Sequence, residues 1–138
     1  MSEENNAMCM APGRVSWNEL VAGNTKTAAE FYEKLFGWKA TPYAPKNGPS
    51  GGPPYSIFKM DVNDERGIGG MMQTMQSGTP SMWLPYVVVD NVDVSLKKAE
   101  SLGAKVCLPV TSIGEIGRIA VILDPQGATI GLHEFPKG

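Results

Sequence analysis

The chain has 138 residues, the usual length of a single domain, and its hydrophobic share of 42% is ordinary for a globular protein. Twelve basic and fourteen acidic residues give a net charge of −2 without any basic block, so nucleic acid is not expected as a partner. No signal peptide and no apolar stretch of ~20 residues is visible, so we expect a cytoplasmic protein that does not bind membranes.

The first part of the chain predicts a strand, a helix and three further strands. Residues 15–21 alternate bulky and polar side chains, as a strand does. Asn24 is placed as the N-cap of a helix that Gly37 ends, and the spacing of the apolar residues predicts one buried helix face. That face holds Ala28, Phe31, Tyr32 and Leu35. Further strands are predicted over residues 38–43, 55–62 and 68–75, and the proline- and glycine-rich segment 42–54 is predicted as a loop.

The same order of elements is predicted again after a linker at residues 76–80. A strand over residues 86–89 leads to a helix that Asp90 or Asp93 caps and Gly103 ends. The inward face of this helix is expected to carry Val92, Leu96, Ala99 and Leu102. Strands are predicted over residues 105–110, 118–123 and 128–135, and Asp124-Pro125-Gln126-Gly127 predicts a type I turn between the last two.

An offset of about 66 residues relates the two parts of the sequence. It places Trp17 on Trp83 and Gly37 on Gly103. Self-similarity at a fixed offset predicts one supersecondary unit used twice. We therefore expect an N-terminal tail over residues 1–13 and a single domain over residues 14–136, built from modules 14–76 and 81–136.

Two sequence elements stand out in this repeat, Ala28-Ala-Glu-Phe31-Tyr32-Glu-Lys-Leu35-Phe36-Gly37-Trp38 and Asp124-Pro125-Gln126-Gly127. Together they resemble the vicinal oxygen chelate superfamily, whose members include glyoxalase I, extradiol dioxygenases and bleomycin resistance proteins. The resemblance covers residues 14–136. It implies an α+β fold in which two βαβββ modules form a cupped, incomplete barrel of mixed sheet with the helices outside. It also implies a homodimer.

The resemblance further implies where the metal ligands of the superfamily belong. In this chain those four positions hold Trp17, Trp83 or Leu84, Gly69 or Gly70, and Gly131. Divalent cations need imidazole, carboxylate or thiolate ligands, which these residues do not supply. Cys9 and Cys107 are distant in the sequence and are expected to be free thiols. We therefore expect neither a metal nor another cofactor.

Trp17 and Trp83 are the strongest candidates for ligand binding. At symmetry-related places they would form two aromatic walls of a cleft, with Tyr86 beside them. The alternative is that both indoles fill the core and close the cleft.

Glu19 and His133 are the candidate catalytic residues. Glu19 follows Trp17 by two residues and His133 follows Gly131 by two, so on regular strands each shares a face with a cleft position. A buried carboxylate or an imidazole would act as an acid or base there. Alternatively, the histidine faces away from the cleft, and the carboxylate pairs with a nearby arginine, Arg14 or Arg118.

Gln73 and the strand glycines complete the candidate site. Gln73 would add a polar contact to the ligand. Gly69, Gly70 and Gly131 leave room for a ligand or for close backbone packing, or they mark a bulge.

These residues favour a glyoxalase- or bleomycin-resistance-like protein that lacks the metal ligands and binds a small apolar or aromatic molecule in its cleft. Two alternatives stay open. One is a glyoxalase-like lyase or isomerase, or a dioxygenase-like enzyme, in which Glu19 and His133 act as acid and base. The other is a non-catalytic interaction module.

Overall fold

The computed structural model describes residues 11–48, 54–61, 63–74 and 78–137. Most of the predicted N-terminal tail with Cys9, the middle of the loop predicted over 42–54, and part of the linker predicted over 76–80 lie outside these residues. The chain divides into two compact units. The α2 unit comprises Trp17–Ala44 and Gly51–Leu84, and the α3 unit comprises Met1–Ser16, Pro45–Ser50 and Pro85–Gly138. Within the described ranges, no helix has the length and apolar character that crossing a bilayer requires.

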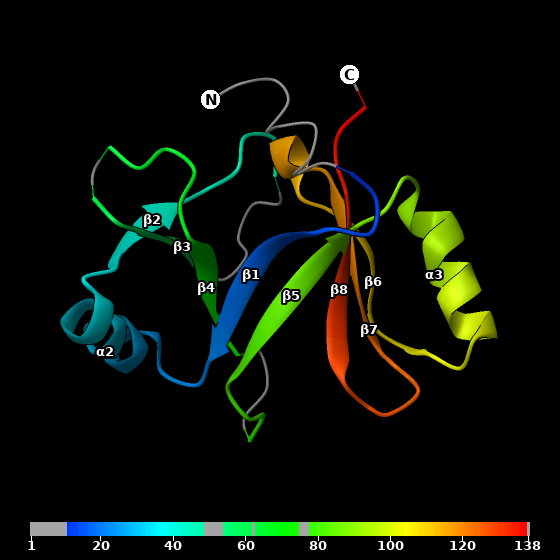
Figure 1. The fold of residues 1–138 in the computed structure, drawn as a ribbon, viewed down its shortest axis with the longest axis horizontal. Coiled ribbons are helices and arrows are strands. Elements are labelled where there is room, and N and C mark those ends of the chain that lie inside the picture. Colours follow the sequence, from blue (N-terminus) through cyan, green and yellow to red (C-terminus); the bar gives the residue numbers. More distant parts are fainter. Residues whose placement is uncertain (1–10, 49–53, 62, 75–77, 138) are drawn as a thin grey trace. The chain divides into compact units, whose positions relative to one another are not determined.

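The α2 unit contains one helix and a mixed sheet (Figure 1). Its elements are β1 (Val15–Ala22, whose first two residues belong to the α3 unit), α2 (Thr25–Phe36), β2 (Lys39–Tyr43), β3 (Tyr55–Lys59) and β4 (Gly69–Gln73). The strand order is β2-β3-β4-β1. β3 pairs antiparallel with both β2 and β4, and β4 pairs parallel with β1. The β-α-β-β-β order predicted for this part of the chain is confirmed.

Helix α2 begins and ends at the predicted residues. The Asn24 side chain accepts a hydrogen bond from the backbone N–H of Thr27 at 3.0 Å, which satisfies one of the free donors of the first turn. Gly37 follows the last turn in the left-handed conformation, with φ 81°, which glycine adopts without steric cost.

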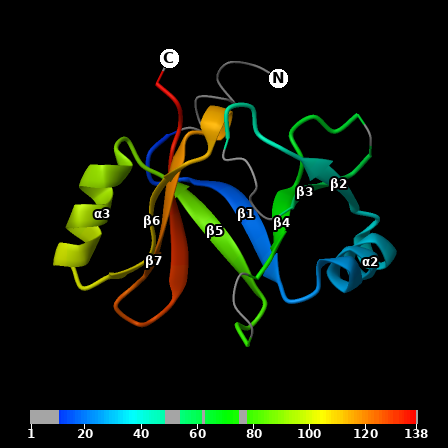
Figure 2. The same ribbon diagram turned by 180° about the vertical axis from the view of Figure 1, so that it is seen from behind.

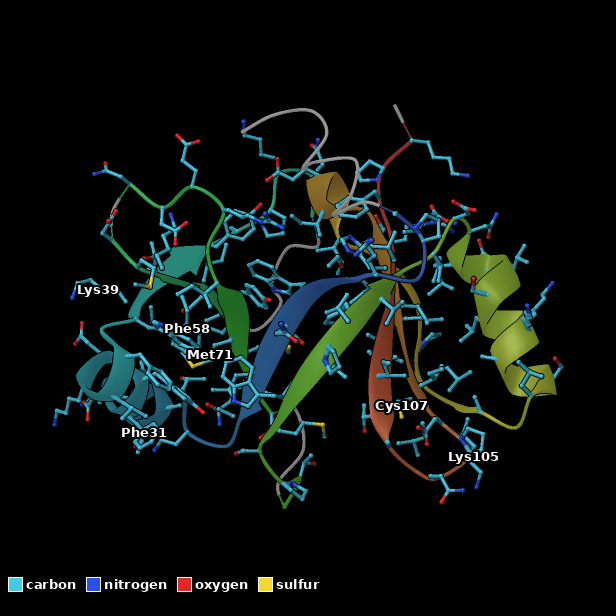
Figure 3. The ribbon with its side chains drawn as sticks, viewed as in Figure 1. Phe31, Lys39, Phe58, Met71, Lys105 and Cys107 are labelled. Carbon is cyan, nitrogen blue, oxygen red and sulfur yellow. The ribbon has the colours of Figure 1, made fainter. Side chains whose placement is uncertain are left out.

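The core of the α2 unit lies between the sheet and α2. Its buried residues are Leu20, Ala22, Phe58 and Met71, the last two of which are labelled in Figure 3. From α2, the residues Ala28, Ala29 and Tyr32 pack against this core. The prediction that Phe31 and Leu35 are buried is wrong, because they are 55% and 57% exposed. The helix is rotated so that Tyr32 and the two small alanines contact the sheet, and this rotation turns the other two side chains outward.

The α3 unit repeats the architecture (Figure 2). Its elements are β5 (Met82–Val88, whose first three residues belong to the α2 unit), α3 (Val92–Ser101), β6 (Lys105–Ser112), the short 3-10 helix η1 (Gly114–Ile116), β7 (Arg118–Leu123) and β8 (Thr129–Glu134). The strand order is β5-β8-β7-β6, with β5 and β8 parallel and the other pairs antiparallel. Val92, Ala120 and Leu132 are the buried residues between α3 and the sheet.

The cap of α3 differs from the prediction. Asn91, rather than Asp90 or Asp93, is the N-cap, and its side chain accepts a hydrogen bond from the Val94 N–H at 3.1 Å. Leu102 follows the helix and is 67% exposed, so it does not belong to the inward face. The turn at Asp124 is confirmed, because the Gly127 N–H donates to the Asp124 carbonyl at 2.9 Å.

Strand β6 ends the strand order of the α3 unit and is irregular. Its pairing with β7 shifts register twice between Val106 and Thr111, and Pro109 lies within the irregular stretch. Val106, Cys107 and Leu108 are exposed, and Cys107 is a free thiol. Figure 3 labels Cys107 and Lys105 on this strand.

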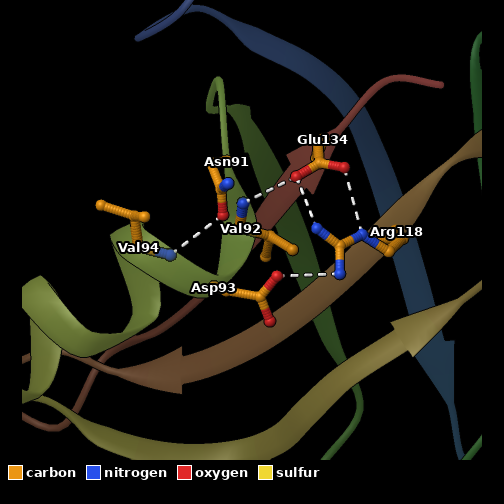
Figure 4. Close-up of polar contacts among 6 residues, drawn as sticks. All are labelled: Asn91, Val92, Asp93, Val94, Arg118 and Glu134. Carbon is orange, nitrogen blue, oxygen red and sulfur yellow. Dashed lines mark hydrogen bonds and ion pairs between the residues drawn. The ribbon is translucent and has the colours of Figure 1, made fainter. Parts of the chain in front are cut away.

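A charged network joins the start of α3 to the sheet of the α3 unit (Figure 4). Arg118 donates to both carboxylate oxygens of Glu134, at 2.8 and 3.1 Å, and forms an ion pair with Asp93 at 2.9 Å. Glu134 also accepts a hydrogen bond from the Val92 N–H at 3.0 Å. Hydrogen bonds from Arg118 and from the Val92 backbone lower the pKa of the buried Glu134 carboxyl. The carboxylate therefore holds a helix start and a neighbouring strand together.

We expect Arg118→Met to lower the Tm, because Glu134 would keep its charge in a buried place without its partner. A group whose folded-state pKa is depressed stabilises the fold above its ordinary pKa, and this stabilisation is lost as the pH falls through the folded-state value. The Tm difference between wild type and variant should therefore shrink at a pH well below 4.5, the ordinary value for this glutamate.

Thermal unfolding followed by circular dichroism at the two pH values measures this difference. Lys39→Met is the matched control, because it breaks an exposed ion pair with Glu33 and should change the Tm little. A Tm loss for Arg118→Met that is the same at both pH values would contradict the assigned role of Glu134.

Candidate functional site

A tyrosine-centred group of polar side chains lies on the face of the α2 unit's sheet opposite α2. We call Trp17, Glu19, Tyr55 and Gly70 the Tyr55 cluster. The Trp17 indole N–H donates to the Tyr55 hydroxyl oxygen at 2.9 Å, and the hydroxyl is hydrogen-bonded to the Glu19 carboxylate. Side chains alternate along a strand, so Trp17 and Glu19 point away from the face on which Leu20 packs against the core.

The Tyr55 hydroxyl is held in its neutral form. Burial is the main cause that raises its pKa, and the nearby Glu19 carboxylate raises the pKa further. Glu19 is only 7% exposed. Arg118, one of its two predicted alternative partners, instead pairs with Glu134 and Asp93. The cluster therefore combines a buried carboxylate with a phenol that remains a hydrogen-bond donor at neutral pH.

The Tyr55 ring lies directly on Gly70. A Cβ atom at Gly70 would come within 1.7 Å of the Tyr55 hydroxyl oxygen and 2.8 Å of its ring. The neighbouring Gly69 faces the other way, where a Cβ atom would lie 2.6 Å from the backbone oxygen of Asn18. Strand pairing through both glycines is regular. Of the predicted alternatives for these glycines, the structure supports close packing rather than a bulge.

In the α3 unit a tyrosine ring also covers the glycine of the last strand, Gly131, but this tyrosine comes from the first strand of the unit. Tyr86 and Gly131 are partners in the parallel pair of β5 and β8, and a Cβ atom at Gly131 would lie 2.2 Å from the Tyr86 ring. Tyr86 is buried, and its ring occupies the space that the missing side chain leaves. The structure thus brings together Tyr86 and Gly131, two of the predicted ligand-binding residues, and the tyrosine ring covers the glycine.

His133 lies two residues further along β8, and both of its ring nitrogens have partners in the α3 unit. Nε2 is 2.7 Å from the carbonyl oxygen of Ile116, and Nδ1 is 3.0 Å from the hydroxyl of Ser16. A carbonyl only accepts, so Nε2 carries the proton, and Nδ1 of the neutral ring accepts from Ser16. Burial lowers the pKa of His133, which favours this neutral form. Glu19 belongs to the other unit, so the predicted acid–base pair is divided between the two units.

The two tryptophans predicted as walls of one cleft lie on opposite faces of a sheet. Trp83 donates from its indole N–H to the Tyr32 hydroxyl at 3.1 Å and packs against Phe58, on the face that α2 covers. Trp17 belongs to the Tyr55 cluster on the other face. The prediction that Trp17 and Trp83 form two aromatic walls of one cleft is therefore wrong.

A register error of one residue explains this result. The offset at the first strand and at the helix start of the two units is 67 residues rather than 66. It relates the N-caps Asn24 and Asn91. It also relates Glu19 and Tyr86, the strand residues that pair with the covered glycines. At this offset the equivalent of Trp17 is Leu84, which is buried. A shift of one residue along a strand moves every side chain to the other face.

Gln73, the remaining predicted contact, lies at the end of β4. Its side-chain amide donates to the Gly23 carbonyl, and its oxygen is 3.4 Å from the Thr25 N–H. The side chain therefore holds the turn between β1 and α2.

Comparison with known proteins finds relatives of this chain in sequence and in fold. No model of a known protein family matches the chain. The chain is 34% identical over 122 residues to "Putative glyoxylase CFP32" of Mycobacterium tuberculosis, and 30% identical over 135 residues to the anthracycline biosynthesis protein DnrV of Streptomyces peucetius. Each alignment covers 88% of this chain, and the chain spans about half of the relative's length, 46% and 47% respectively.

Solved structures show the same fold. Methylmalonyl-CoA epimerase of Streptomyces coelicolor, in complex with 2-nitronate-propionyl-CoA, matches with a TM-score of 0.60 at 13% identity, covering 92% of this chain and all of that one. The Mn(II)-bound glyoxalase of Novosphingobium aromaticivorans matches with a TM-score of 0.56 at 14% identity, covering 89% and 39%. These relatives and structures support the predicted resemblance to the vicinal oxygen chelate superfamily. The fold of this chain is of the α+β class, with mixed sheet and helices, as predicted.

The residues at the superfamily's metal positions do not fit a divalent metal. The structure resolves the alternatives left by the sequence to Trp17, Gly70, Leu84 and Gly131. None of these has an imidazole, carboxylate or thiolate group, and tyrosine rings cover both glycines. In the part of the chain that the structure describes, no three His, Cys, Asp or Glu residues are grouped closely enough to hold a metal ion.

Sequence reasoning missed Tyr55 and Ser16. Each is hydrogen-bonded to a predicted site residue that is distant in the sequence. Tyr55 is 38 residues from its partner Trp17, and Ser16 is 117 residues from its partner His133. One signal was available for Tyr55, because glycine inside a paired strand indicates that a bulky neighbour lies across it.

We expect Gly131→Ala to lower the free energy of unfolding by about 1–3 kcal/mol, because the added methyl group overlaps the Tyr86 ring. The effects of Gly131→Ala and Tyr86→Leu should be strongly non-additive in urea denaturation. Gly23→Ala is the control, since a Cβ atom there meets only the Ser81 hydroxyl at 3.5 Å. Additive effects at Gly131 and Tyr86 would show that the ring does not lie on this glycine.

His133 gives a second expectation. Because its folded-state pKa lies below the ordinary 6.5, the unfolded chain binds this proton more readily. The free energy of unfolding should therefore be unaffected well above pH 6.5 and should fall as the pH drops below it. His133 is the chain's one histidine, so His133→Asn should remove this dependence from urea denaturation curves measured across that range. A dependence that persists in the variant would assign it to another group.

Proposed function

We propose that this protein is a metal-independent member of the superfamily that binds a small, mostly apolar or aromatic molecule. The observation that carries the proposal is the filling of the metal positions. Tyrosine rings cover Gly70 and Gly131, and the Trp17 indole is hydrogen-bonded to Tyr55. A surface of this composition recognises a ligand by apolar contact and a few hydrogen bonds rather than by chelation.

In this proposal the Tyr55 cluster supplies the contacts within the α2 unit. The half-buried Trp17 indole would provide the aromatic surface. The Glu19 carboxylate would accept a hydrogen bond from a hydroxyl or amine of the ligand, because a carboxylate can accept several. In the α3 unit the buried pair of Tyr86 and Gly131 would form the floor beneath the bound ligand, and Gln73 would position the β1–α2 turn.

The relatives support an aromatic ligand. DnrV of Streptomyces peucetius and DauV of a second Streptomyces strain are named for anthracycline biosynthesis, and both are about 30% identical to this chain. The solved epimerase structures contain a CoA ester. We therefore propose a planar polycyclic aromatic molecule as the first ligand class and an acyl-CoA as the second. The expected homodimer and cytoplasmic location remain part of the proposal.

One observation favours an enzyme as the second candidate. A buried carboxylate beside a neutral phenol is an arrangement that can move a proton. Glu19 would remove a proton from a carbon next to a carbonyl group, and Tyr55 would stabilise the charge that develops on the oxygen. The proton would return from Glu19 to the substrate, as in an isomerase.

The test is thermal unfolding with a panel of anthracyclines, smaller aromatic compounds and acyl-CoA esters, with a chelator present. We expect a Tm increase with at least one aromatic compound. Trp17→Phe should weaken that binding about tenfold, a loss that corresponds to ~1.4 kcal/mol. Trp38→Phe, on the opposite face of the sheet, is the matched control and should leave binding unchanged.

Three outcomes would contradict the proposed binder. Stoichiometric zinc, manganese or iron in protein purified without a tag would overturn the metal-independent assignment. Turnover of a bound compound that Glu19→Gln abolishes would replace the binder with the enzyme. Complete insensitivity to the panel would favour an interaction module.

A further inference from the structure

A pocket lies in the α2 unit on the face of the sheet that α2 covers. It has a volume of about 270 Å3 and is lined by Asn18, Trp38, Ile68 and Trp83. Trp38 and Ile68 pack against the core beneath α2, whereas the Tyr55 cluster lies on the other side of the sheet. The pocket is therefore separate from the site of the proposed function.

Two indole rings at right angles form the aromatic corner of this pocket. The centroids of Trp38 and Trp83 are 6.3 Å apart, with an angle of 85° between the ring planes. Tyr32 fixes both rings, because it stacks on Trp38 at 5.6 Å and accepts the Trp83 indole hydrogen bond. Contacts within the protein thus hold the corner in place. Trp83 still has 39% of its surface exposed, so it remains available for contact.

Gly69 lies beside this corner. A Cβ atom there would lie 2.6 Å from the Asn18 backbone oxygen and 3.8 Å from the Trp83 ring. The close approach of β1 and β4 therefore requires glycine at this position. The absence of a side chain leaves this part of the Trp83 ring uncovered.

Asn18 provides the polar group of the pocket. It alternates with the buried Glu19 and shares its face with Leu20 and Ala22, which are in the core. Unlike them it is exposed, and its side chain forms no hydrogen bond to any residue that the structure describes. A carboxamide presents a donor and an acceptor side by side in one plane. In an apolar pocket, one such group fixes the orientation of a ligand.

We propose that this pocket binds a planar heterocycle of one or two rings whose edge carries an adjacent hydrogen-bond donor and acceptor, as in a lactam or a nucleobase. The two indoles contact the ring, and the Asn18 amide pairs with the polar edge. The pocket volume of about 270 Å3 lies just below the roughly 300–1,000 Å3 typical of ligand sites, as expected for a ligand of one or two rings. A polycyclic molecule of the kind proposed for the Tyr55 cluster is therefore too large for it.

The test uses two probes that differ in a single donor, 2-pyridone and N-methyl-2-pyridone. Titrations are followed by the three indole N–H resonances in two-dimensional NMR spectra, which three Trp→Phe variants assign. We expect 2-pyridone to shift the resonances of Trp38 and Trp83 in a saturable way and to leave that of Trp17 unchanged. Asn18→Leu should weaken 2-pyridone binding about 5–10-fold, as the loss of one or two hydrogen bonds predicts. It should weaken binding of the methylated probe less, because that probe keeps only the carbonyl acceptor.

Trp83→Phe should weaken binding of both probes, and Trp17→Phe should affect neither. The absence of saturable shifts with 2-pyridone would overturn the proposal, as would 2-pyridone binding that Asn18→Leu leaves unchanged. Asn18 is exposed, so its variant should fold, and circular dichroism verifies this for every variant. Failure here leaves the aromatic panel for the Tyr55 cluster unaffected, because that panel depends on Trp17.

Discussion

The packing of a tyrosine ring onto a strand glycine determines what this structure can do. It occurs once in each unit, where Tyr55 covers Gly70 and Tyr86 covers Gly131. In both cases the glycine is in the last strand of the unit and pairs in parallel with the first strand. Because a Cβ atom at either glycine would overlap the ring, the two residues of each pair depend on one another. The superfamily position that could hold a metal ligand is therefore part of the packing.

The sequence predicted the elements well because it records local periodicity directly. Alternation along β1, the 3.6-residue period of α2 and the cap residues Asn24 and Gly37 each depend on neighbours a few positions away. The repeat itself was also predicted correctly. Its offset was not constant, because it is 67 residues at the N-caps Asn24 and Asn91 and 66 at Gly37 and Gly103. An offset read at the helix ends therefore misplaced the strands and the α3 cap by one residue.

That single residue had large consequences for the predicted site. With the correct offset, Leu84 is the equivalent of Trp17, and Trp83 lies on the face of the sheet under α2. The hydrogen-bond partners of the site residues could not be predicted either. Nothing local in the sequence connects Trp17 with Tyr55, or His133 with Ser16 and the Ile116 carbonyl, because only the fold brings these groups together. The position of a polar group along a strand was predictable, whereas its partner was not.

The irregularity of β6 affects how this chain behaves towards other chains. An outermost strand with exposed Val106 and Leu108 would normally invite a foreign strand to extend the sheet, which is the first step of aggregation. Pro109 lacks an N–H group, and the two register shifts interrupt the even row of donors and acceptors that such an extension needs. This edge therefore protects the protein against polymerisation while leaving its apolar side chains in contact with water.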